Sequence, residues 1–357
     1  MEGAKQGVSR RQFNHRLTAL PLILAGCATE DTAPTVDRPW HHLAGGFRNP
    51  PGSLARGGDF GDWTTFFLRR FGSADEAAAP DGHVLPPDAV MVGLQRHAAF
   101  DSVTWLGHAS FLIRLDGRTI LTDPFLTEHA SPLPPLGPER FAPPGLTPAR
   151  LPRIDVLLLS HNHYDHLDLP TIEALPAKDR IQAIVPLRLG HYFASRGFAH
   201  VRELDWHDEV EAAGIKITGL PAIHFSKRAL FDRNATLWSG YAVQSTKKRI
   251  HFAGDTGYGP IFPELGRNGR PFDLSIVPIG AYEPRLLMQA VHVNPEEAVR
   301  LARELKARRV AGMHWGTIQL TEEPVFEPPA RFRRAAHAAG YAEEDVWVMR
   351  IGETRAV

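Results

Sequence analysis

The sequence predicts an α/β fold of four layers (αββα), in which two β-sheets pack together and helices cover their outer faces. Two observations lead to this prediction. Short apolar or alternating runs that suit strands recur from residue 102 onward, and helical patterns separate several of them. Strands and helices interleave in this way twice in succession, which favours two sheets. A doubly wound single sheet is the competing arrangement.

The composition is that of an ordinary globular protein with a balanced charge. Of 357 residues, 43% are hydrophobic, and the Lys+Arg and Asp+Glu totals are both 40. With no net charge and no long basic tract, we expect no nucleic-acid partner. The 18 histidines weakly favour a metal site. Nothing in the composition fixes the oligomeric state.

The N-terminus contains the order of features found in an export signal. Arg10 and Arg11 in "SRRQF" precede an apolar run from Leu17 to Gly26, and "LAGC" ends at Cys27. These stretches resemble a twin-arginine signal and the lipobox of bacterial lipoproteins, which implies cleavage before Cys27 and lipidation of that residue. The expected protein is exported and lipid-anchored to a membrane, facing the periplasm or the exterior. A disordered tail on a cytoplasmic protein is the alternative.

Three segments are expected along the chain. Residues 1–27 form the signal, and residues 28–100 form a tether and an irregular leading segment that packs on the core. One helix is expected there, around "DWTTFFLRRF", whose aromatic residues point to packing on the main body or to contact with lipid. Residues 101–357 form a single catalytic domain. Cys27 is the only cysteine, so an intramolecular disulfide and a thiolate zinc cage are both excluded.

The first half of the domain starts as a β-meander. Its strands are "SVTWLG", "SFLIRL" and "RTILTD", and the continuous apolar run "IDVLLLS" suits a strand that is buried on both faces. "TIEALPAK" is expected to form a short helix, "IQAIVP" a strand, and "RLGHYFASRG" a helix that Gly197 ends.

The second half repeats the alternation. The strand candidates are "GIKITGLPA", "LWSGYAVQS", "KRIHFAGD", "LSIVPIG" and "RVAGMHW". "VNPEEAVRLARELKA" is the clearest helix, because Asn294 can cap it, Pro295 suits the first turn and Glu297 completes a capping box. A strand at "DVWVMRIG" is expected to close the chain.

The densest group of polar side chains follows the leucine run. "SHNHYDH" contains His161, His163, Asp165 and His166 directly after an apolar strand. Rigid backbone on one side and loop freedom on the other let such side chains converge on a metal ion. In a chain with this histidine content the pattern arises by chance in on the order of one sequence in several hundred. A polar surface turn is the bland interpretation.

Three later residues could complete the metal shells. His224, Asp255 and His314 each follow an apolar run that suits a strand. Each by itself is a weak signal, since a lone histidine there is more often hydrogen-bonded in the core. Together with the cluster they give seven donors, enough for two ions with one bridging carboxylate.

Several longer motifs match one known family. "WLGHASFLIRLDG", "ILTDPF", "LSHNHYDHLD", "ELDWHDEV", "FAGDTGY", "VPIGAYEPR", "HVNPEEAVR" and "HWGT" resemble the N-acyl-phosphatidylethanolamine-hydrolysing phospholipase D family of the metallo-β-lactamase superfamily. The resemblance runs from about Trp105 to Pro329.

The resemblance implies a dizinc site with assigned ligands. It implies that His161, His163 and His224 bind one zinc, that Asp165, His166 and His314 bind the other, and that Asp255 bridges them; iron or manganese would also suit such donors. A hydroxide held between the metals would attack a membrane phospholipid, releasing N-acylethanolamine and phosphatidic acid.

Other residues are expected near the reaction. Asp165 is also expected to orient or deprotonate the water, and His292 to contact a phosphate oxygen or the leaving group. Asp123 is expected to orient a ligand histidine, and His108 to lie near the metals without binding them. Within "GAYEPR", Tyr282 and Arg285 are candidates for the substrate wall. A backbone-bonded loop histidine, a turn carboxylate and a salt bridge are the respective structural alternatives for His292, Asp123 and Arg285.

Two other functions stay open at the level of sequence. A dizinc lactonase or ester hydrolase would use the same metal site on a different bond, and the absence of a basic phosphate-binding patch would favour it. A metal-binding or scaffold protein without turnover is the third, although a purely structural site would close around one ion.

Overall fold

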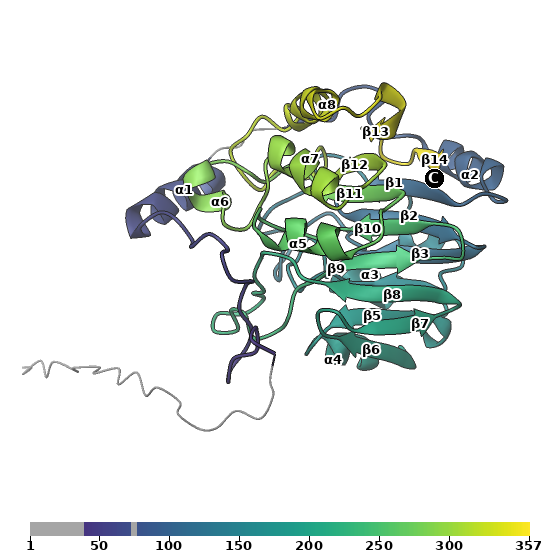
Figure 1. The fold of residues 1–357 in the computed structure, drawn as a ribbon, viewed down its shortest axis with the longest axis horizontal. Helices are drawn as coiled ribbons and strands as arrows, with labels where there is room; N and C mark the ends of the chain where they lie inside the picture. Colours follow the sequence, from purple (N-terminus) through teal and green to yellow (C-terminus); the bar gives the residue numbers. More distant parts are fainter. Residues whose placement is uncertain (1–38, 73–76) are drawn as a thin grey trace, which may run out of the picture. The chain divides into compact units, whose positions relative to one another are not determined.

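The computed structural model describes residues 39–72 and 77–357, and Trp40–Val357 form one compact unit. Within the described residues, two seven-stranded sheets pack face to face with helices outside them (Figure 1). The predicted four-layer sandwich is therefore confirmed, and the single doubly wound sheet is wrong. Among the described helices, none has the length and apolar character needed to cross a bilayer.

The first sheet has the strand order β14-β1-β2-β3-β4-β5-β6. Pairing is antiparallel from β14 to β3 and parallel from β3 to β6. The strands are β1 (Ser102–Gly107), β2 (Ser110–Leu115), β3 (Arg118–Thr122), β4 (Val156–Leu158), β5 (Gln182–Pro186), β6 (His200–Leu204) and β14 (Thr354–Ala356).

The second sheet repeats this plan with the order β13-β12-β11-β10-β9-β8-β7. Pairing is antiparallel from β7 to β10 and parallel from β10 to β13. The strands are β7 (Glu209–Ala212), β8 (Ile215–Leu220), β9 (Gly240–Gln244), β10 (Arg249–Phe252), β11 (Leu274–Pro278), β12 (Arg309–Met313) and β13 (Val346–Trp347).

Helices lie outside the two sheets. The α-helices are α1 (Phe60–Gly72), α2 (Pro87–Arg96), α3 (Leu169–Ala174), α4 (Gly190–Ala194), α5 (Ile261–Asn268), α6 (Arg285–Met288), α7 (Pro295–Glu304) and α8 (Pro328–Ala338). Short 3-10 helices span Pro148–Arg150, Lys178–Arg180 and Glu343–Asp345.

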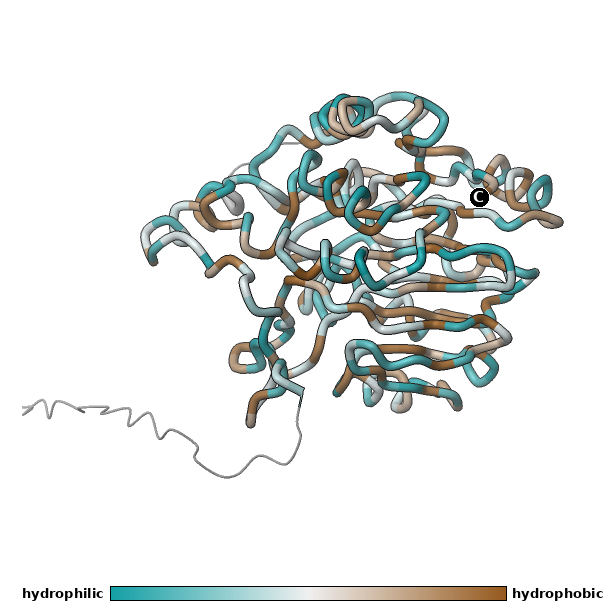
Figure 2. Tube along the Cα trace, viewed as in Figure 1, coloured by the Kyte–Doolittle hydropathy of each residue, from teal (hydrophilic) through white to brown (hydrophobic). Residues whose placement is uncertain are grey.

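Strands in the first sheet are apolar on both faces because both faces are covered. Val156 and Leu158 of β4 belong to the core between the two sheets, whereas Leu157 belongs to the separate core that includes Ile172 of α3 and Phe193 of α4. Hydrophobic segments accordingly follow the strands in Figure 2. Burial on both faces explains the continuous leucine run of the sequence.

The predicted helices α1 and α7 are both present. The Oδ1 of Asn294 accepts a hydrogen bond from the Glu297 backbone at 2.8 Å, and a Glu297 oxygen accepts from the Asn294 backbone at 3.0 Å. This capping box satisfies backbone donors that the helix leaves unpaired. α1 packs through Phe66 against Leu287 and Met288 near α6.

Two expectations about the ends of the domain were wrong. α2 lies in the segment that was expected to be irregular, and its Val90 is fully buried in the outer core. β13 stops at Trp347 and does not close the chain, because the chain crosses to the first sheet and pairs β14 with β1. Ile351 joins the crossing segment to His83 and Leu85 through backbone hydrogen bonds.

Candidate metal centre

The seven predicted donors converge at one edge of the sandwich. Each lies shortly beyond the end of a strand: β4, β8, β10 or β12. The donors are His161, His163, Asp165, His166, His224, Asp255 and His314, and their donor atoms fall into two groups of four, the second of which also contains His108. Strand ends held by hydrogen-bonded neighbours give these side chains a rigid mount.

The first group is made by three imidazoles and a carboxylate. The Nε2 of His161 lies 2.8 Å from the Nδ1 of His163, which lies 3.3 Å from the Nε2 of His224. Asp255 Oδ2 lies 3.8 Å from the His161 nitrogen and 3.7 Å from that of His224. Three ring nitrogens and one oxygen thus face a common point, as a tetrahedral metal site requires.

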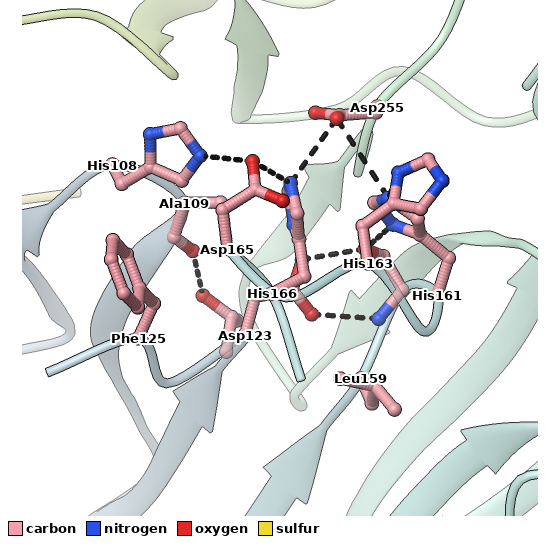
Figure 3. Close-up of polar contacts among 12 residues, drawn as sticks. His108, Ala109, Asp123, Phe125, Leu159, His161, His163, Asp165, His166 and Asp255 are labelled. Carbon is pink, nitrogen blue, oxygen red and sulfur yellow. Dashed lines mark hydrogen bonds and ion pairs between the residues drawn. The ribbon is translucent and has the colours of Figure 1, made fainter. Parts of the chain in front are cut away.

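The second group surrounds Asp165. Its Oδ2 lies 2.9 Å from the Nε2 of His108, 3.5 Å from that of His166 and 3.4 Å from that of His314. The hydrogen bond from His108 fixes the direction of the Asp165 carboxylate (Figure 3). His108 thus contacts a carboxylate of the donor group, and the expectation that it lies near the metals without binding them stays a prediction.

Asp255 joins the two groups. Its Oδ2 is 3.1 Å from the Nε2 of His166 and 3.2 Å from the Nε2 of His314, in addition to its approach to the first group. Figure 3 shows this carboxylate above the ring of His166, with lines to both sides. A carboxylate in this place can bridge two ions.

Hydrogen bonds behind the donors orient their rings. Buried Asp123 accepts from the Ser160 backbone at 2.6 Å, from the Ser160 hydroxyl at 2.5 Å and from the Nδ1 of His166 at 2.7 Å. The Nδ1 of His224 donates to the Val291 carbonyl at 2.9 Å. These contacts leave the Nε2 of His166 and of His224 free to face the centre.

Three residues of the centre have a left-handed backbone. The φ angles of His108, Asp123 and His314 are 52°, 33° and 62°. Such a conformation costs a non-glycine residue of order 1–3 kcal/mol and persists only where the surroundings fix it. Here the strain aims three side chains at one place.

The donor set fits divalent metal ions. The Nε2 atoms of His166 and His314 and the Oδ1 of Asp255 are buried and have no hydrogen-bond partner. Buried polar atoms are rarely left in this state unless a ligand satisfies them. Nitrogen and carboxylate donors suit zinc, iron or manganese. By contrast, the Nε2 atoms of His41 and His42 already have a hydrogen-bond partner, since both are bonded to Asp205, at 2.6 and 2.7 Å.

The charges of the centre are strongly coupled. Burial alone lowers the pKa of His314, but the nearby carboxylates of Asp255 and Asp165 raise it to about 9. The same carboxylates, with Asp123, overcome burial and raise the pKa of His166 well above its usual value. Burial opposes ionisation of Asp165, yet His166 and the other imidazoles hold its pKa well below the usual range. The metal-free centre therefore holds protonated His166 and His314 beside two carboxylates. Burial lowers the pKa of the other three donor imidazoles, those of His161, His163 and His224.

His292 lies beside both donor groups. Its ring centroid is 5.1 Å from that of His224 and 5.5 Å from that of His314, and its Nδ1 is buried without a hydrogen-bond partner. Burial lowers its pKa to about 3. The ring is therefore neutral near pH 7 and faces the same cavity as the donors.

The structure does not place Tyr282 or Arg285 on the cavity wall. Tyr282 is fully buried, and the Arg331 guanidinium lies 4.8 Å from its ring centroid. Arg285 donates to both oxygens of Glu297, at 2.9 and 3.0 Å, and to the carbonyl of His292. Arg285 is therefore paired with a carboxylate of the capping box. Its hydrogen bond to the His292 carbonyl supports the backbone of His292. Cys27 and its predicted signal lie outside the described residues.

A cavity of about 540 Å³ opens from the metal centre. At one end it is lined by His163, Asp165, Asp255, His292 and His314. The rest of its lining comes from apolar residues of α1 and α6 and of neighbouring loops, and from three cationic residues. These residues are Phe60, Trp63, Phe66, Phe67, Phe225, Met288, Val291, Leu320, Arg56, Lys227 and Arg233. This wall was not predicted from the sequence; only the aromatic helix, expected to pack on the main body or to contact lipid, pointed towards it.

The chain matches known proteins over the region that contains the centre. Residues 118–315 match the protein family described as "Beta-lactamase superfamily domain". A protein of Caenorhabditis elegans named N-acyl-phosphatidylethanolamine-hydrolyzing phospholipase D 1 is 39% identical over 66% of this chain and 69% of its own length. A mitochondrial protein of Saccharomyces cerevisiae with the same activity in its name is 34% identical over 67% of this chain and 53% of its own.

Two further comparisons set the limits of this likeness. An uncharacterised Mycobacterium tuberculosis protein is 40% identical over 66% of the chain, and the match spans 64% of that relative's length. The crystal structure of isothiocyanate hydrolase from Delia radicum gut bacteria covers 72% of this chain and 98% of its own, with a TM-score of 0.57 and 22% identity. At that identity the likeness shows the fold alone.

Proposed function

Because this chain belongs to the N-acyl-phosphatidylethanolamine-hydrolysing phospholipase D family of the metallo-β-lactamase fold and is a metal-dependent hydrolase, we propose that it is a phosphodiesterase of the phospholipase D type. The bond cleaved is the one between phosphorus and the ethanolamine oxygen of an N-acyl-phosphatidylethanolamine or a related phospholipid. Water adds to that bond, and the products are N-acylethanolamine and phosphatidic acid.

One observation supports this proposal above the others: two metal-donor groups share a cavity with an apolar wall and three cations. A phosphodiester needs positive charge around its oxygens, and acyl chains need apolar surface. A cavity of about 540 Å³ is large enough for the headgroup region of a lipid together with part of its chains.

The donor groups would each hold one metal ion. His161, His163 and His224 would hold one ion, with Asp255 shared between the two. The second would be held by Asp165, His166 and His314. When bound, such ions lower the pKa of water and neutralise charge on the transferring phosphoryl group.

The remaining residues of the centre position the substrate and move protons. Asp165 is a carboxylate that His108 orients through a 2.9 Å hydrogen bond, so one of its oxygens can accept a proton from the attacking water. Neutral His292 can donate a hydrogen bond to a phosphate oxygen or to the leaving oxygen. Arg285 holds the backbone of His292 in place.

A lactonase or ester hydrolase stays the alternative function. The cationic residues of the cavity wall favour the phosphodiesterase over it. An ester or lactone carries no charge before attack and would not require Arg56, Lys227 and Arg233 in its wall. Absence of a basic patch would have favoured the lactonase or ester hydrolase. The structure instead brings three basic residues together from segments that are far apart in the chain.

The test is turnover of N-acyl-phosphatidylethanolamine by zinc-loaded full-length protein in detergent micelles. Mass spectrometry should detect N-acylethanolamine and phosphatidic acid in equal amounts. Asp255→Asn should reduce the rate at least about 10³-fold, since it removes the shared carboxylate. His191→Ala, at an exposed histidine of α4, serves as the matched control and should keep the rate. Hydrolysis of lactones with no cleavage of the diester would contradict the proposal.

The membrane partner and the exported location are proposals too. We infer them from the signal at residues 10–27 and from the chemistry of the substrate, which resides in a bilayer. A lipid anchor at Cys27 would keep the enzyme at the surface that supplies its substrate.

A further inference from the structure

Three cationic side chains line the cavity without acidic partners. Arg56, Lys227 and Arg233 share the wall with the metal donors, and within residues 39–72 and 77–357 none of them forms an ion pair with a carboxylate. The carboxylates that line this cavity are Asp165 and Asp255, both of which belong to the metal centre. The positive charge of the wall is therefore not neutralised by the described part of the protein.

The guanidinium groups of Arg56 and Arg233 contact aromatic rings instead of carboxylates. Arg56 Cζ lies 3.6 Å from the Trp63 ring centroid, and Arg233 Cζ lies 4.2 Å from that of Phe225. A cation on the face of a ring gains attraction and keeps its full charge. Trp63 belongs to α1 and Phe225 follows His224, so the two sides of the cavity each present one cation.

The two arginines repel each other. Burial lowers the pKa of Arg56, and the nearby Arg233 lowers it further. Burial also lowers the pKa of Arg233. Arginine nevertheless stays protonated near neutral pH because its ordinary pKa is above 12. Bound metal ions would add more positive charge to the same cavity, so a guest that carries a cation would be repelled by the arginines and by the metal ions.

N-acylation changes one feature of an ethanolamine headgroup that this wall can sense. The free amine of phosphatidylethanolamine is an ammonium, whereas the amide of the N-acylated lipid is neutral. The phosphodiester keeps its single negative charge in both. The acylated headgroup is thus a net anion, and the unmodified one is a zwitterion whose ammonium would lie beside Arg56, Lys227 and Arg233, which are exposed to solvent but carry their full charge.

We propose that Arg56, Lys227 and Arg233 form a charge filter that admits phosphodiesters without an amine cation and rejects zwitterionic phosphoethanolamine and phosphocholine headgroups. The filter deepens the proposed function, because it names the substrate class of the same cavity. At an effective dielectric constant near 20 and a separation of about 7 Å, one facing charge pair corresponds to roughly a 10- to 50-fold preference.

The test compares two soluble diesters that differ only at the amine. These are the p-nitrophenyl diesters of N-acetylphosphoethanolamine and of phosphoethanolamine, with total consumption followed by phosphorus NMR. For the zinc-loaded full chain we expect kcat/KM to favour the N-acetyl diester at least about 10-fold. In the double variant Arg56→Gln/Arg233→Gln, which keeps Lys227, that ratio should fall several-fold, mainly through faster use of the zwitterion.

Two further variants separate charge from packing. Arg233→Lys keeps the charge and should keep most of the preference, even though the stacking on Phe225 changes. Arg202→Gln, at an exposed arginine of β6, is the matched control and should leave the ratio unchanged. Zinc content and the thermal midpoint, measured for every variant, identify a fold that has been lost.

A second readout needs no turnover. Calorimetric binding of both diesters to the full chain in EDTA should show tighter binding of the N-acetyl form, and the double glutamine variant should show a smaller difference between them. An unchanged ratio in the double variant, or a wild type that treats both diesters equally in both assays, would overturn the filter. Failure to cleave the micellar lipid while the diester ratio persists would sink the lipid substrate and leave the filter standing.

Discussion

The cavity lining has two parts that are built on different principles. The metal donors form one part, called here the metal end, and the apolar and cationic wall forms the other end. At the metal end, every donor follows a strand. Hydrogen bonds to groups behind the rings orient two of the donors: His166 donates to Asp123, and His224 donates to the Val291 carbonyl. At the other end, the wall comes from α1, α6 and the loop after His224, held by apolar contacts and by arginines on aromatic rings. Phe60 there is 88% exposed, whereas His166 and His224 are fully buried.

This difference separates chemistry from substrate choice. Reacting groups need positions fixed within a fraction of an ångström, which sheet edges provide. A wall that receives a lipid needs apolar area and charge in roughly the right place, which a helix and a loop provide. Changes at the metal end should therefore abolish turnover, and changes at the other end should alter which substrates are used.

Removal of the metal gives the largest expected effect. Dialysis against EDTA should abolish diester hydrolysis, and zinc should restore it. His314, with a pKa raised to about 9, and His166, with a pKa raised well above its usual value, carry protons at pH 7 in the metal-free centre. Metal binding needs neutral imidazole, so zinc uptake at pH 7 should release about two protons, and apparent affinity should rise up to about pH 9. Uptake without proton release, measured in weakly buffered solution, would contradict this charge state.

Asp123→Asn should act next most strongly. The amide keeps the size of the side chain but puts a donor where His166 and Ser160 both donate. A loss of roughly 10- to 100-fold in zinc affinity or in kcat is expected. Competition with a fluorescent chelator measures the affinity, and Asp88→Asn on exposed α2 is the control. Equal zinc affinity and equal kcat in both variants would show that the ring of His166 needs no such support.

Phe60→Ser should have the smallest effect, confined to lipid. The side chain lines the cavity and is 88% exposed, so its loss should change the free energy of unfolding by no more than about 0.5 kcal/mol. KM for micellar substrate should rise a few-fold, and hydrolysis of short soluble diesters should not change. Phe100→Ser, at a residue 58% exposed outside the cavity lining, should alter neither. Equal losses on both substrates would show that the wall supports the metal end after all.

Much of the metal end could be predicted from sequence because its signals are local. "SHNHYDH" places four polar donors directly after an apolar strand, and Asn294 with Glu297 announces the start of α7. The roles of the donors stay predictions until metal is measured, but the structure brings all seven together. The direct hydrogen bond between His108 and Asp165 was not expected, since 57 residues separate the two in the chain.

The other end could not be predicted because its contacts are long-range. Arg56 and Arg233 line one cavity although more than 170 residues lie between them, and neither has a sequence neighbour that points to the other. Arg285 was a candidate for the substrate wall, and only the folded chain shows that its guanidinium is paired with Glu297. β14 likewise pairs with β1 across almost the whole domain.

By itself, then, the sequence determined the layers and the donors of this protein, because hydrophobic periodicity and side-chain chemistry act over a few residues. The tertiary structure alone decided which arginines line the cavity, which one is neutralised by a carboxylate, and where the apolar wall meets the metal-donor residues. Those outcomes depend on chain segments that meet only after two sheets have packed, and the free energy of that packing leaves no pattern in any short stretch of sequence.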